Sequence, residues 1–203
     1  MRTAKTVLTV IQERGKQKKP IERVYKLLFN RELYLNAYAK LYPNNGAMTK
    51  GVTDETVDGM SIQKIDRMIE ILREEKYQWK PARREYIKKK NGKKRPLGIP
   101  VWGDKVLQEV MRQILEAYYE PQFSEHSHGF RPNRGCHTAL QEIQVWKGTR
   151  WFIEGDISQY FDTIDHKILL EILARNIHDG RFIRLVSNML EAGYLEEWKF
   201  NQT

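Results

Sequence analysis

Apolar residues recur at helical spacing in several stretches of the chain. Between Ile21 and Leu41 they follow one another every three or four residues, with a break indicated at Asn30-Arg31. Ser61 can cap a second helix, whose apolar face would consist of Ile62, Ile65, Ile69 and Leu72. The pattern therefore predicts two helices in the first third of the chain.

A longer helical pattern starts near Asp104, a residue suited to a helix cap, and runs to Tyr118 before Pro121 stops it. The turn-forming stretch from Gln122 to Gly135 predicts a structured loop, and 138–146 predicts a short helix. Asp165 can cap one more helix over 167–174.

Two stretches predict strands instead. Asn91-Gly92 is a strong hairpin-turn signal, and it lies between Arg84–Ile87 and Pro96–Pro100. The run Arg150–Ile157 is aromatic and β-branched, which predicts a buried strand. Helices beside short antiparallel strands indicate the α+β fold class.

The predicted hairpin carries an unusual charge density. Six of the eight residues from Lys88 to Arg95 are basic. Like charges facing each other across a strand pair destabilise it. A lysine-protected sheet edge is one interpretation, and a binding surface for nucleic-acid backbone or a nucleotide triphosphate is the other.

Composition narrows the class of protein. The 203 residues are 40% hydrophobic and 30% charged, which indicates a globular chain with a real core. Cys136 is the only cysteine, so no internal disulfide can form, and a reducing cytoplasmic location is expected. No apolar run reaches membrane-spanning length, so no membrane association is expected, and residues 1–20 are basic and predicted to be loosely held.

The net charge of +9 is divided unevenly along the chain. Residues 1–100 hold 24 Lys and Arg against 11 Asp and Glu, whereas residues 101–203 hold 11 against 15. A basic half beside carboxylates suits an enzyme that holds nucleic acid and binds metal ions. It equally suits an RNA-binding protein whose second half is structural.

Asp156 is the main candidate for chemistry. It follows the predicted apolar strand, where a carboxylate is costly unless it is paired or binds a cation. It could simply cap a turn. Alternatively it could bind Mg²⁺, which prefers one or two carboxylates together with substrate phosphates, while the cationic hairpin supplies partners for a triphosphate.

Three ordered blocks carry a resemblance to a known family: NGAMTKGVTDETVDGMS, the long block from KKKNGKKRPLGIP to RPNRGCHTAL, and WFIEGDISQYFDTIDHKILL. They resemble the group II intron-encoded reverse transcriptases, also called maturases. That family has a right-hand polymerase architecture of fingers, palm and thumb. The resemblance implies an N-terminal extension and fingers over 1–104, part of the palm over 105–166, and a returning fingers segment over 167–203.

The resemblance also implies roles for single residues. Asp156 matches the first catalytic aspartate, a Mg²⁺ ligand joined by the backbone carbonyl of Ile157, and Phe161 matches the aromatic gate that excludes a ribose 2′-OH. The residues implied to bind the incoming dNTP are Lys89, Arg95, Ser158, Gln159 and Phe161. The basic N-terminal segment, with Lys18, Lys19 and Arg23, would contact template and intron RNA.

One departure from the family pattern limits the expected activity. The family's other two catalytic aspartates lie in a later Tyr-x-Asp-Asp motif, and the sequence contains no Asp-Asp pair. We therefore expect a fragment without the remaining palm, the thumb and the maturase domain, which would not polymerise alone. Palm surface left exposed in such a fragment could pair with a second copy as a homodimer.

Several other residues allow two interpretations. Asp162 and Asp165 could be metal ligands, but a turn residue and a helix cap are preferred. His126, His128, Cys136 and His137 match no standard zinc spacing, so loop packing and hydrogen bonding are preferred. Arg131 and Arg134 could contact RNA backbone or serve no special purpose. Five aromatic residues could stack bases, but most of them are expected in the core: Trp79, Tyr86, Trp102, Trp146 and Trp151.

Three classes of function remain on the sequence alone. The first is part of an RNA-directed DNA polymerase that also assists group II intron splicing and mobility. The second is an RNA-binding splicing cofactor without polymerase activity. The third is a basic RNA-binding domain with no catalytic ancestry.

Overall fold

The computed structural model describes residues 2–88, 92, 94–158, 160–197 and 199–202, with residues 161 and 162 described by their backbone alone. The α-helices are α1 (Ala4–Lys16), α2 (Arg31–Leu41), α3 (Ile62–Arg73), α4 (Trp102–Tyr119), α5 (Cys136–Gln144), α6 (Tyr160–Thr163), α7 (His166–Ala174) and α8 (Gly180–Leu190). Single 3₁₀ turns or short 3₁₀ helices occupy Val24–Phe29, Val57–Gly59 and Glu120–Gln122. The strands are β1 (Ile21–Glu22), β2 (Ala82–Lys88), β3 (Lys94–Ile99), β4 (Ile177–His178), β5 (Tyr194–Glu196) and β6 (Lys199–Asn201).

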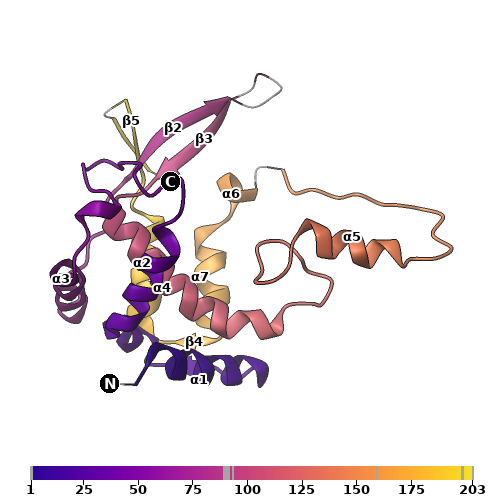
Figure 1. Cartoon of the computed structure of the whole chain (residues 1–203), viewed down its shortest axis with the longest axis horizontal. Helices are drawn as coiled ribbons and strands as arrows, with labels where there is room; N and C mark the ends of the chain where they lie inside the picture. The colour runs from indigo at the N-terminus through magenta and orange to yellow at the C-terminus, as the bar shows by residue number, and fades with distance from the viewer. Residues whose placement is uncertain (1, 89–91, 93, 159, 198, 203) are drawn as a thin grey trace.

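This mixture of helices and two small sheets confirms the α+β class (Figure 1). β1 and β4 form a parallel pair, and the larger sheet has the order β3-β2-β5-β6. None of the described helices is long and apolar enough to span a membrane.

Helix α4 is the centre of the core, because α1 and α2 both pack against it. Its inward face is buried over more than three turns, and it consists of Val106, Leu107, Val110, Met111, Ile114 and Tyr118. Their spacing of three or four residues is the one predicted from the sequence. The α4 scaffold therefore fixes the position of the elements on either side of it.

The N-terminal segment is folded, so the prediction that residues 1–20 are loosely held is wrong. Thr3 caps α1 by accepting a hydrogen bond from the Thr6 amide at 3.2 Å. At Gly15, α1 comes so close to α4 that a Cβ would overlap the carbonyl oxygen of Tyr118. Only glycine permits this approach, and it places the basic end of α1 firmly on the body of the molecule.

Local capping signals identify two helix starts correctly. Ser61 and Asp165 each accept a backbone N–H from the first turn of α3 and α7. Asn30, where the sequence indicated only a break, caps α2 by accepting a hydrogen bond from the Glu32 amide at 3.0 Å. Helix α5 begins two residues before the predicted start, and residues 21–29 form β1 and a 3₁₀ helix in place of the predicted α-helix. Ile62, predicted to be on the apolar face of α3, is instead exposed.

Asp104 does not cap α4. The helix begins at Trp102, and Asp104 lies within its first turn, almost completely buried. Its carboxylate accepts hydrogen bonds from the Tyr77 hydroxyl at 2.6 Å and the Lys80 amide at 3.0 Å. Asp104 therefore fastens the segment that leads into β2, a long-range task that sequence spacing does not reveal.

Residues 150–157 do not form the predicted buried strand. Trp151 is 86% exposed, Ile153 is 93% exposed, and the segment has no regular secondary structure. A strand requires a neighbour to accept its backbone hydrogen bonds, and each described strand is paired elsewhere. The buried strand predicted from composition alone is therefore wrong.

Candidate nucleotide and RNA interface

The cationic hairpin is present, but its register differs from the prediction. β2 and β3 are antiparallel, with Lys88 opposite Lys94 and Ile87 opposite Arg95. A two-residue turn at Asn91-Gly92 would place Arg95 opposite Lys88 instead. The described strands are therefore shifted by one residue, and residues 89–91 and 93 lie outside the described part of the chain.

This register decides which basic side chains share a face, because directly opposite residues of a strand pair point to the same side. Arg95 shares its face with Arg83, Ile87, Leu97 and Ile99. Lys94 lies on the other face, with Arg84, Tyr86 and Lys88. Lys89, the predicted partner of Arg95 in triphosphate binding, lies outside the described residues.

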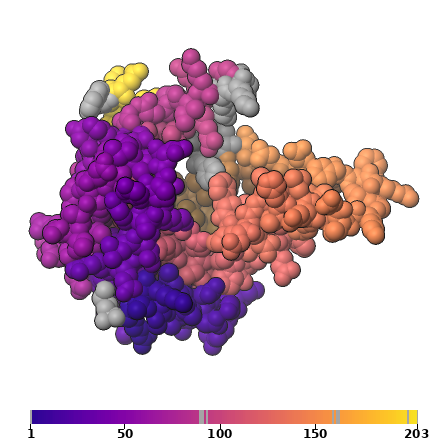
Figure 2. Space-filling view, in the orientation of Figure 1, coloured from indigo at the N-terminus to yellow at the C-terminus, as the bar shows by residue number. Residues whose placement is uncertain are grey.

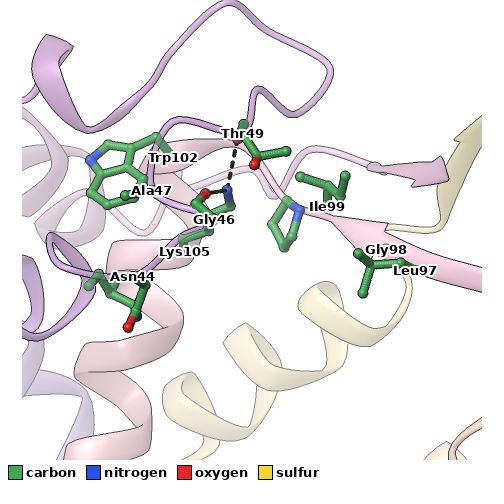
Figure 3. Close-up of a pocket in the computed structure, with 11 residues that line it drawn as sticks. Asn44, Gly46, Ala47, Thr49, Leu97, Gly98, Ile99, Trp102 and Lys105 are labelled. Carbon is green, nitrogen blue, oxygen red and sulfur yellow. Dashed lines mark hydrogen bonds between the residues drawn. The ribbon is translucent and has the colours of Figure 1, made fainter. Parts of the chain in front are cut away.

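The Arg95 face of the hairpin is fixed to the loop that follows α2. Arg83 donates to the Lys50 carbonyl from Nε at 3.1 Å and from Nη2 at 2.9 Å. A pocket of about 260 Å³ lies between this loop, Leu97–Pro100 and the start of α4 (Figure 3). Leu97–Pro100, most of the second predicted strand of the hairpin, thus form one wall of a small apolar pocket.

Lys105 closes the floor of that pocket. Its Nζ donates to the carbonyls of Thr49 at 3.0 Å and Gly46 at 3.4 Å, which holds the loop against α4 (Figure 3). Burial lowers the pKa of Lys105, and the nearby charge of Arg83 lowers it further. This lysine is a loop-organising residue that sequence reasoning did not identify.

The opposite face of the hairpin is anchored to β5. The Arg84 guanidinium lies 3.6 Å from the centre of the Tyr194 ring, and the Tyr86 hydroxyl donates to Glu196 at 2.6 Å. That hydrogen bond raises the pKa of Tyr86. The Arg84–Tyr194 and Tyr86–Glu196 contacts hold the hairpin to β5. Arg95, nearer the tip of the hairpin, is exposed.

The predicted catalytic segment is exposed. Asp156, Ile157 and Ser158 lie between α5 and α6 on the surface. Gln159 is outside the described residues, and Phe161 falls within α6 but its side chain is not described. The structure therefore leaves all the residue roles predicted for this segment untested.

Asp156 offers the oxygen ligand that Mg²⁺ prefers. Within the described residues, however, no group of three or more His, Cys, Asp and Glu side chains could hold a metal ion. The carboxylate of Asp156 is a suitable ligand for a divalent cation, but the described residues do not provide a complete set of protein ligands around it. Metal binding at Asp156 would have to draw on further ligands such as substrate phosphates.

The N-terminal basic residues form a second exposed surface. Lys18, Lys19 and Arg23 are all exposed, and the Lys19 carbonyl accepts a hydrogen bond from the Tyr118 hydroxyl at 3.0 Å. Arg23 has a left-handed backbone (φ 55°) and lines a cavity of about 400 Å³ together with Arg2 and Arg14. Arg2 and Arg14 were not predicted to belong to this surface, because only the packing of α1 brings them to it.

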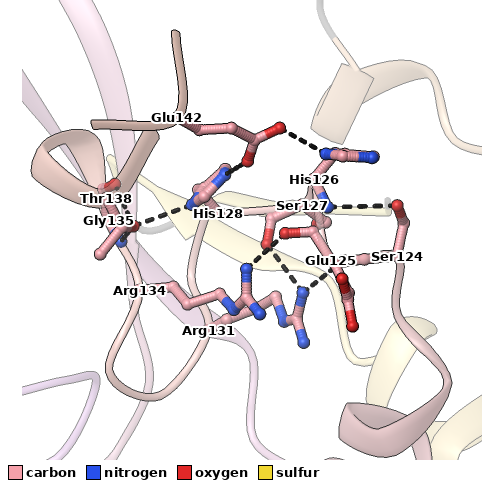
Figure 4. A network of polar contacts seen from close by, with 10 residues as sticks. All are labelled: Ser124, Glu125, His126, Ser127, His128, Arg131, Arg134, Gly135, Thr138 and Glu142. Carbon is pink, nitrogen blue, oxygen red and sulfur yellow. Dashed lines mark hydrogen bonds and ion pairs between the residues drawn. The ribbon is translucent and has the colours of Figure 1, made fainter. Parts of the chain in front are cut away.

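Arg131 turns inward and organises the loop 123–135 (Figure 4). Its side chain is 8% exposed, pairs with Glu120 at 2.9 Å, and donates to the carbonyls of Ser124 at 2.6 Å and Ser127 at 2.8 Å. Arg134 donates to the Glu125 carbonyl. The predicted RNA contacts of both arginines stay untested, and the contacts of Arg131 favour a structural task.

Two of the four residues considered for zinc binding hold the same loop to α5 (Figure 4). His126 contacts Glu142, and His128 contacts Glu142 at 2.8 Å and Thr138 at 2.8 Å. The two histidines, His128 first, lower the pKa of the Glu142 carboxyl. The preferred interpretation, hydrogen bonding within the loop, is confirmed for His126 and His128.

Comparison with known proteins identifies the family of this chain. A family model described as reverse transcriptase (RNA-dependent DNA polymerase) matches residues 87–202, which include β3 and Asp156. The match covers more than half of the chain, so this chain belongs to the reverse transcriptase family.

Its relatives include proteins of group II introns. The chain is 49% identical over 183 residues to the group II intron-encoded protein LtrA of Lactococcus lactis subsp. cremoris, covering 89% of this chain and 31% of that protein. It is 46% identical over 205 residues to a 91 kDa protein in the cob intron of Schizosaccharomyces pombe, covering 97% and 25%. It is 36% identical over 93 residues to the mitochondrial nuclear intron maturase 1 of Arabidopsis thaliana, covering 45% and 13%. The chain thus spans about a third or less of the length of these relatives.

Proposed function

We propose that this chain forms the fingers and part of the palm of an RNA-directed DNA polymerase that assists group II intron splicing and mobility. The observation that carries the proposal is the family match across the β3 strand and Asp156, together with 49% identity to an intron-encoded protein. The proposed fingers comprise residues 1–104 and 167–203, and the proposed partial palm comprises 105–166.

The proposed task of the hairpin is to hold the triphosphate of an incoming dNTP. Arg95, with Lys89, would bind phosphate oxygens, since a guanidinium can donate two parallel hydrogen bonds to them. The backbone N–H groups of Ser158 and Gln159 would add donors, and Phe161 would exclude a ribose 2′-OH. The anchoring of the hairpin base by Arg83 and Arg84 supports this task, because it limits the motion of Arg95.

The proposed task of Asp156 is to hold Mg²⁺ through its carboxylate, with the Ile157 carbonyl as a second ligand. When bound, the ion would neutralise phosphate charge and favour ionisation of the attacking hydroxyl. The remaining carboxylates are proposed to come from outside these 203 residues; the matched relatives are about three times as long or longer. The chain by itself is therefore proposed to bind RNA and nucleotide without polymerising.

The proposed RNA partner is intron or template RNA, bound by Lys18, Lys19 and Arg23 at the end of α1. These three side chains are exposed, and they follow the close contact of α1 with α4 at Gly15, which supports this assignment. An RNA-binding splicing cofactor without polymerase activity is the second candidate, and it is favoured by the similarity to a protein named as a maturase.

The hairpin register supplies a sharp experiment. In primer extension by the complete gene product, Arg95→Ala should raise the KM for dNTP by roughly tenfold, the effect of losing one charge-assisted contact. Lys94→Ala is the matched control, because this substitution removes a positive charge from the opposite face of the same hairpin. Equal effects of the two substitutions would overturn the assignment of Arg95. A complete lack of DNA synthesis in the unsubstituted protein would favour the splicing cofactor instead.

A further inference from the structure

A second group of basic side chains lies beside Arg23, although it comes from the other end of the chain. Arg23 lines the cavity of about 400 Å³ at α1, and it also lines a cavity of about 600 Å³ whose walls include Arg181 and Arg184 of α8. Helix α1 forms the lower end of the molecule in Figures 1 and 2, and its atoms lie on the outer surface in Figure 2. The basic surface at the end of α1 therefore continues past Arg23 onto α8.

The β1–β4 pair brings these two distant segments together. The two strands are parallel, and Arg23 and Asp179 each follow the last residue pair of this short ladder. The Asp179 carboxylate accepts hydrogen bonds from the Tyr25 amide at 2.9 Å and the Arg181 amide at 3.2 Å. Hydrogen bonds to the backbone of both segments thus fix Arg23 beside the start of α8.

Arg181 and Arg184 direct two guanidinium groups to one carboxylate. Residues three apart share a face of a helix, and both of these side chains pair with Glu75, Arg181 at 3.5 Å. They nevertheless remain 37% and 58% exposed. Because Asp179 already caps α8, the positive charge of this surface comes from the arginine side chains and not from the helix N-terminus.

Basic side chains outnumber carboxylates across the combined surface. Among the described residues that border it, the basic ones are Arg2, Arg14, Lys18, Lys19, Arg23, Arg181 and Arg184, against Glu22, Glu75 and Asp179. Most of the basic residues are arginines, whose planar guanidinium can donate two parallel hydrogen bonds to one phosphate. Such a surface favours a chain of phosphates over a single small anion.

We propose that one RNA backbone is bound across both surfaces, with Arg181 and Arg184 contacting phosphates next to those held by Arg23. This inference rests on the RNA binding proposed above for the end of α1, and it adds a second binding segment from the opposite end of the chain. RNA bound in this way would hold α1 and α8 together across the β1–β4 pair.

The salt dependence of RNA binding by the 203-residue chain measures these contacts. With a stem-loop RNA as the probe, Arg181→Gln combined with Arg184→Gln should lower the slope of log affinity against log salt concentration by about 1.4–1.8, since each lost phosphate contact removes about 0.7–0.9. Lys64→Gln combined with Arg67→Gln is the matched control. These two exposed residues are also three positions apart on a helix, and Lys64 pairs with the Glu55 carboxylate. The control should leave the slope unchanged.

Removing the shared carboxylate tests the same contact in the opposite direction. Glu75→Gln frees both guanidinium groups and removes one negative charge, so RNA affinity should rise about two- to threefold in about 0.1 M salt. Glu55→Gln removes the carboxylate of the control pair and should leave the affinity unchanged. Unfolding would lower the affinity, so a gain is informative even where the arginine variants fail to fold.

Three results would overturn the proposal. They are an unchanged slope for the Arg181 and Arg184 variant, an equal loss in the α3 control, and an unchanged affinity for Glu75→Gln. If replacement of Lys18, Lys19 and Arg23 lowers the slope in the same assay, the RNA binding proposed for α1 stands while its extension to α8 fails. A lack of RNA binding by the unsubstituted chain would overturn both.

Discussion

Asp104 is predicted to be a main support of the cationic hairpin, although it contacts neither nucleotide nor RNA. Its buried carboxylate receives the Tyr77 hydroxyl at 2.6 Å and the Lys80 amide at 3.0 Å. Tyr77 also packs edge-to-face on Trp79, whose indole N–H donates to the Leu185 carbonyl at 3.0 Å. Asp104→Ala would therefore release the segment that joins α3 to β2 from α4, leaving the Trp79 hydrogen bond to α8 in place.

The expected cost follows from the two donors left without an acceptor. An unsatisfied buried donor costs about 1–3 kcal/mol. The Lys80 amide belongs to an exposed residue, so water can partly replace the carboxylate there. We therefore expect Asp104→Ala to lower the free energy of unfolding by about 2–3 kcal/mol.

The pH dependence gives a second, independent signature. Burial raises the pKa of the Asp104 carboxyl, and the bonds from Tyr77 and Lys80 offset part of that rise. The folded state then binds the proton more tightly than the unfolded state. The contribution of this group to stability is largest below the ordinary pKa of an aspartate and falls as the pH rises through the raised value. Asp104→Asn cannot ionise, so the stability of the unsubstituted chain relative to this variant should fall over that pH range.

Urea unfolding followed by circular dichroism measures both effects. Asp66→Ala is the control, because Asp66 makes an exposed pair with Arg31 and its loss should cost no more than about 1 kcal/mol. A loss of less than about 1 kcal/mol for Asp104→Ala, or a pH-independent difference from Asp104→Asn, would refute the role assigned to the buried carboxylate.

Three further predictions concern α1, the RNA surface and nucleotide selection. Gly15→Ala should lower the free energy of unfolding by about 1–3 kcal/mol, because a Cβ has no space beside Tyr118. Gly46→Ala, at a position with open space around it, should change that free energy by less than about 0.5 kcal/mol in the same urea assay. Equal effects of the two substitutions would contradict the close packing of α1 on α4. Replacing Lys18, Lys19 and Arg23 by Ala should reduce the slope of log affinity against log salt concentration for RNA binding by up to about 2.1–2.7, since each lost phosphate contact removes about 0.7–0.9. A charge-matched change at Lys64, Arg67 and Lys76, on and after α3, is the control, and an unaltered slope would remove the α1 surface from RNA binding. Phe161→Ala in the complete gene product should increase ribonucleotide incorporation in primer extension, and unchanged sugar discrimination would reject the gate assignment.

Helix starts were predictable where the information is local. Ser61 and Asp165 cap helices within three residues of themselves, so a short window of sequence contains both donor and acceptor. Asp104 has the same residue type but a partner 27 residues away in the chain, Tyr77, and its task is invisible at short range. The close approach of Gly15 to Tyr118 escaped prediction for the same reason.

Strand and site predictions depended on neighbours that a single segment does not specify. The hairpin was predicted from Asn91-Gly92, but its register is set by the pairing of whole strands and is shifted by one residue. Composition predicted a strand at 150–157, and most tryptophans were expected in the core; Trp102 is buried, whereas Trp146 and Trp151 are exposed. The roles of Asp156 and Arg95 came from family resemblance, since their charge and spacing alone also fit a plain RNA-binding surface.

The central claim is that Asp156 belongs to a polymerase active site in the complete gene product. The most direct measurement compares Asp156→Asn with Glu154→Gln, a neighbouring exposed carboxylate, in RNA-templated primer extension and in RNA binding. The account predicts that Asp156→Asn abolishes DNA synthesis while RNA affinity stays unchanged, and that Glu154→Gln retains both. DNA synthesis that survives Asp156→Asn would contradict it.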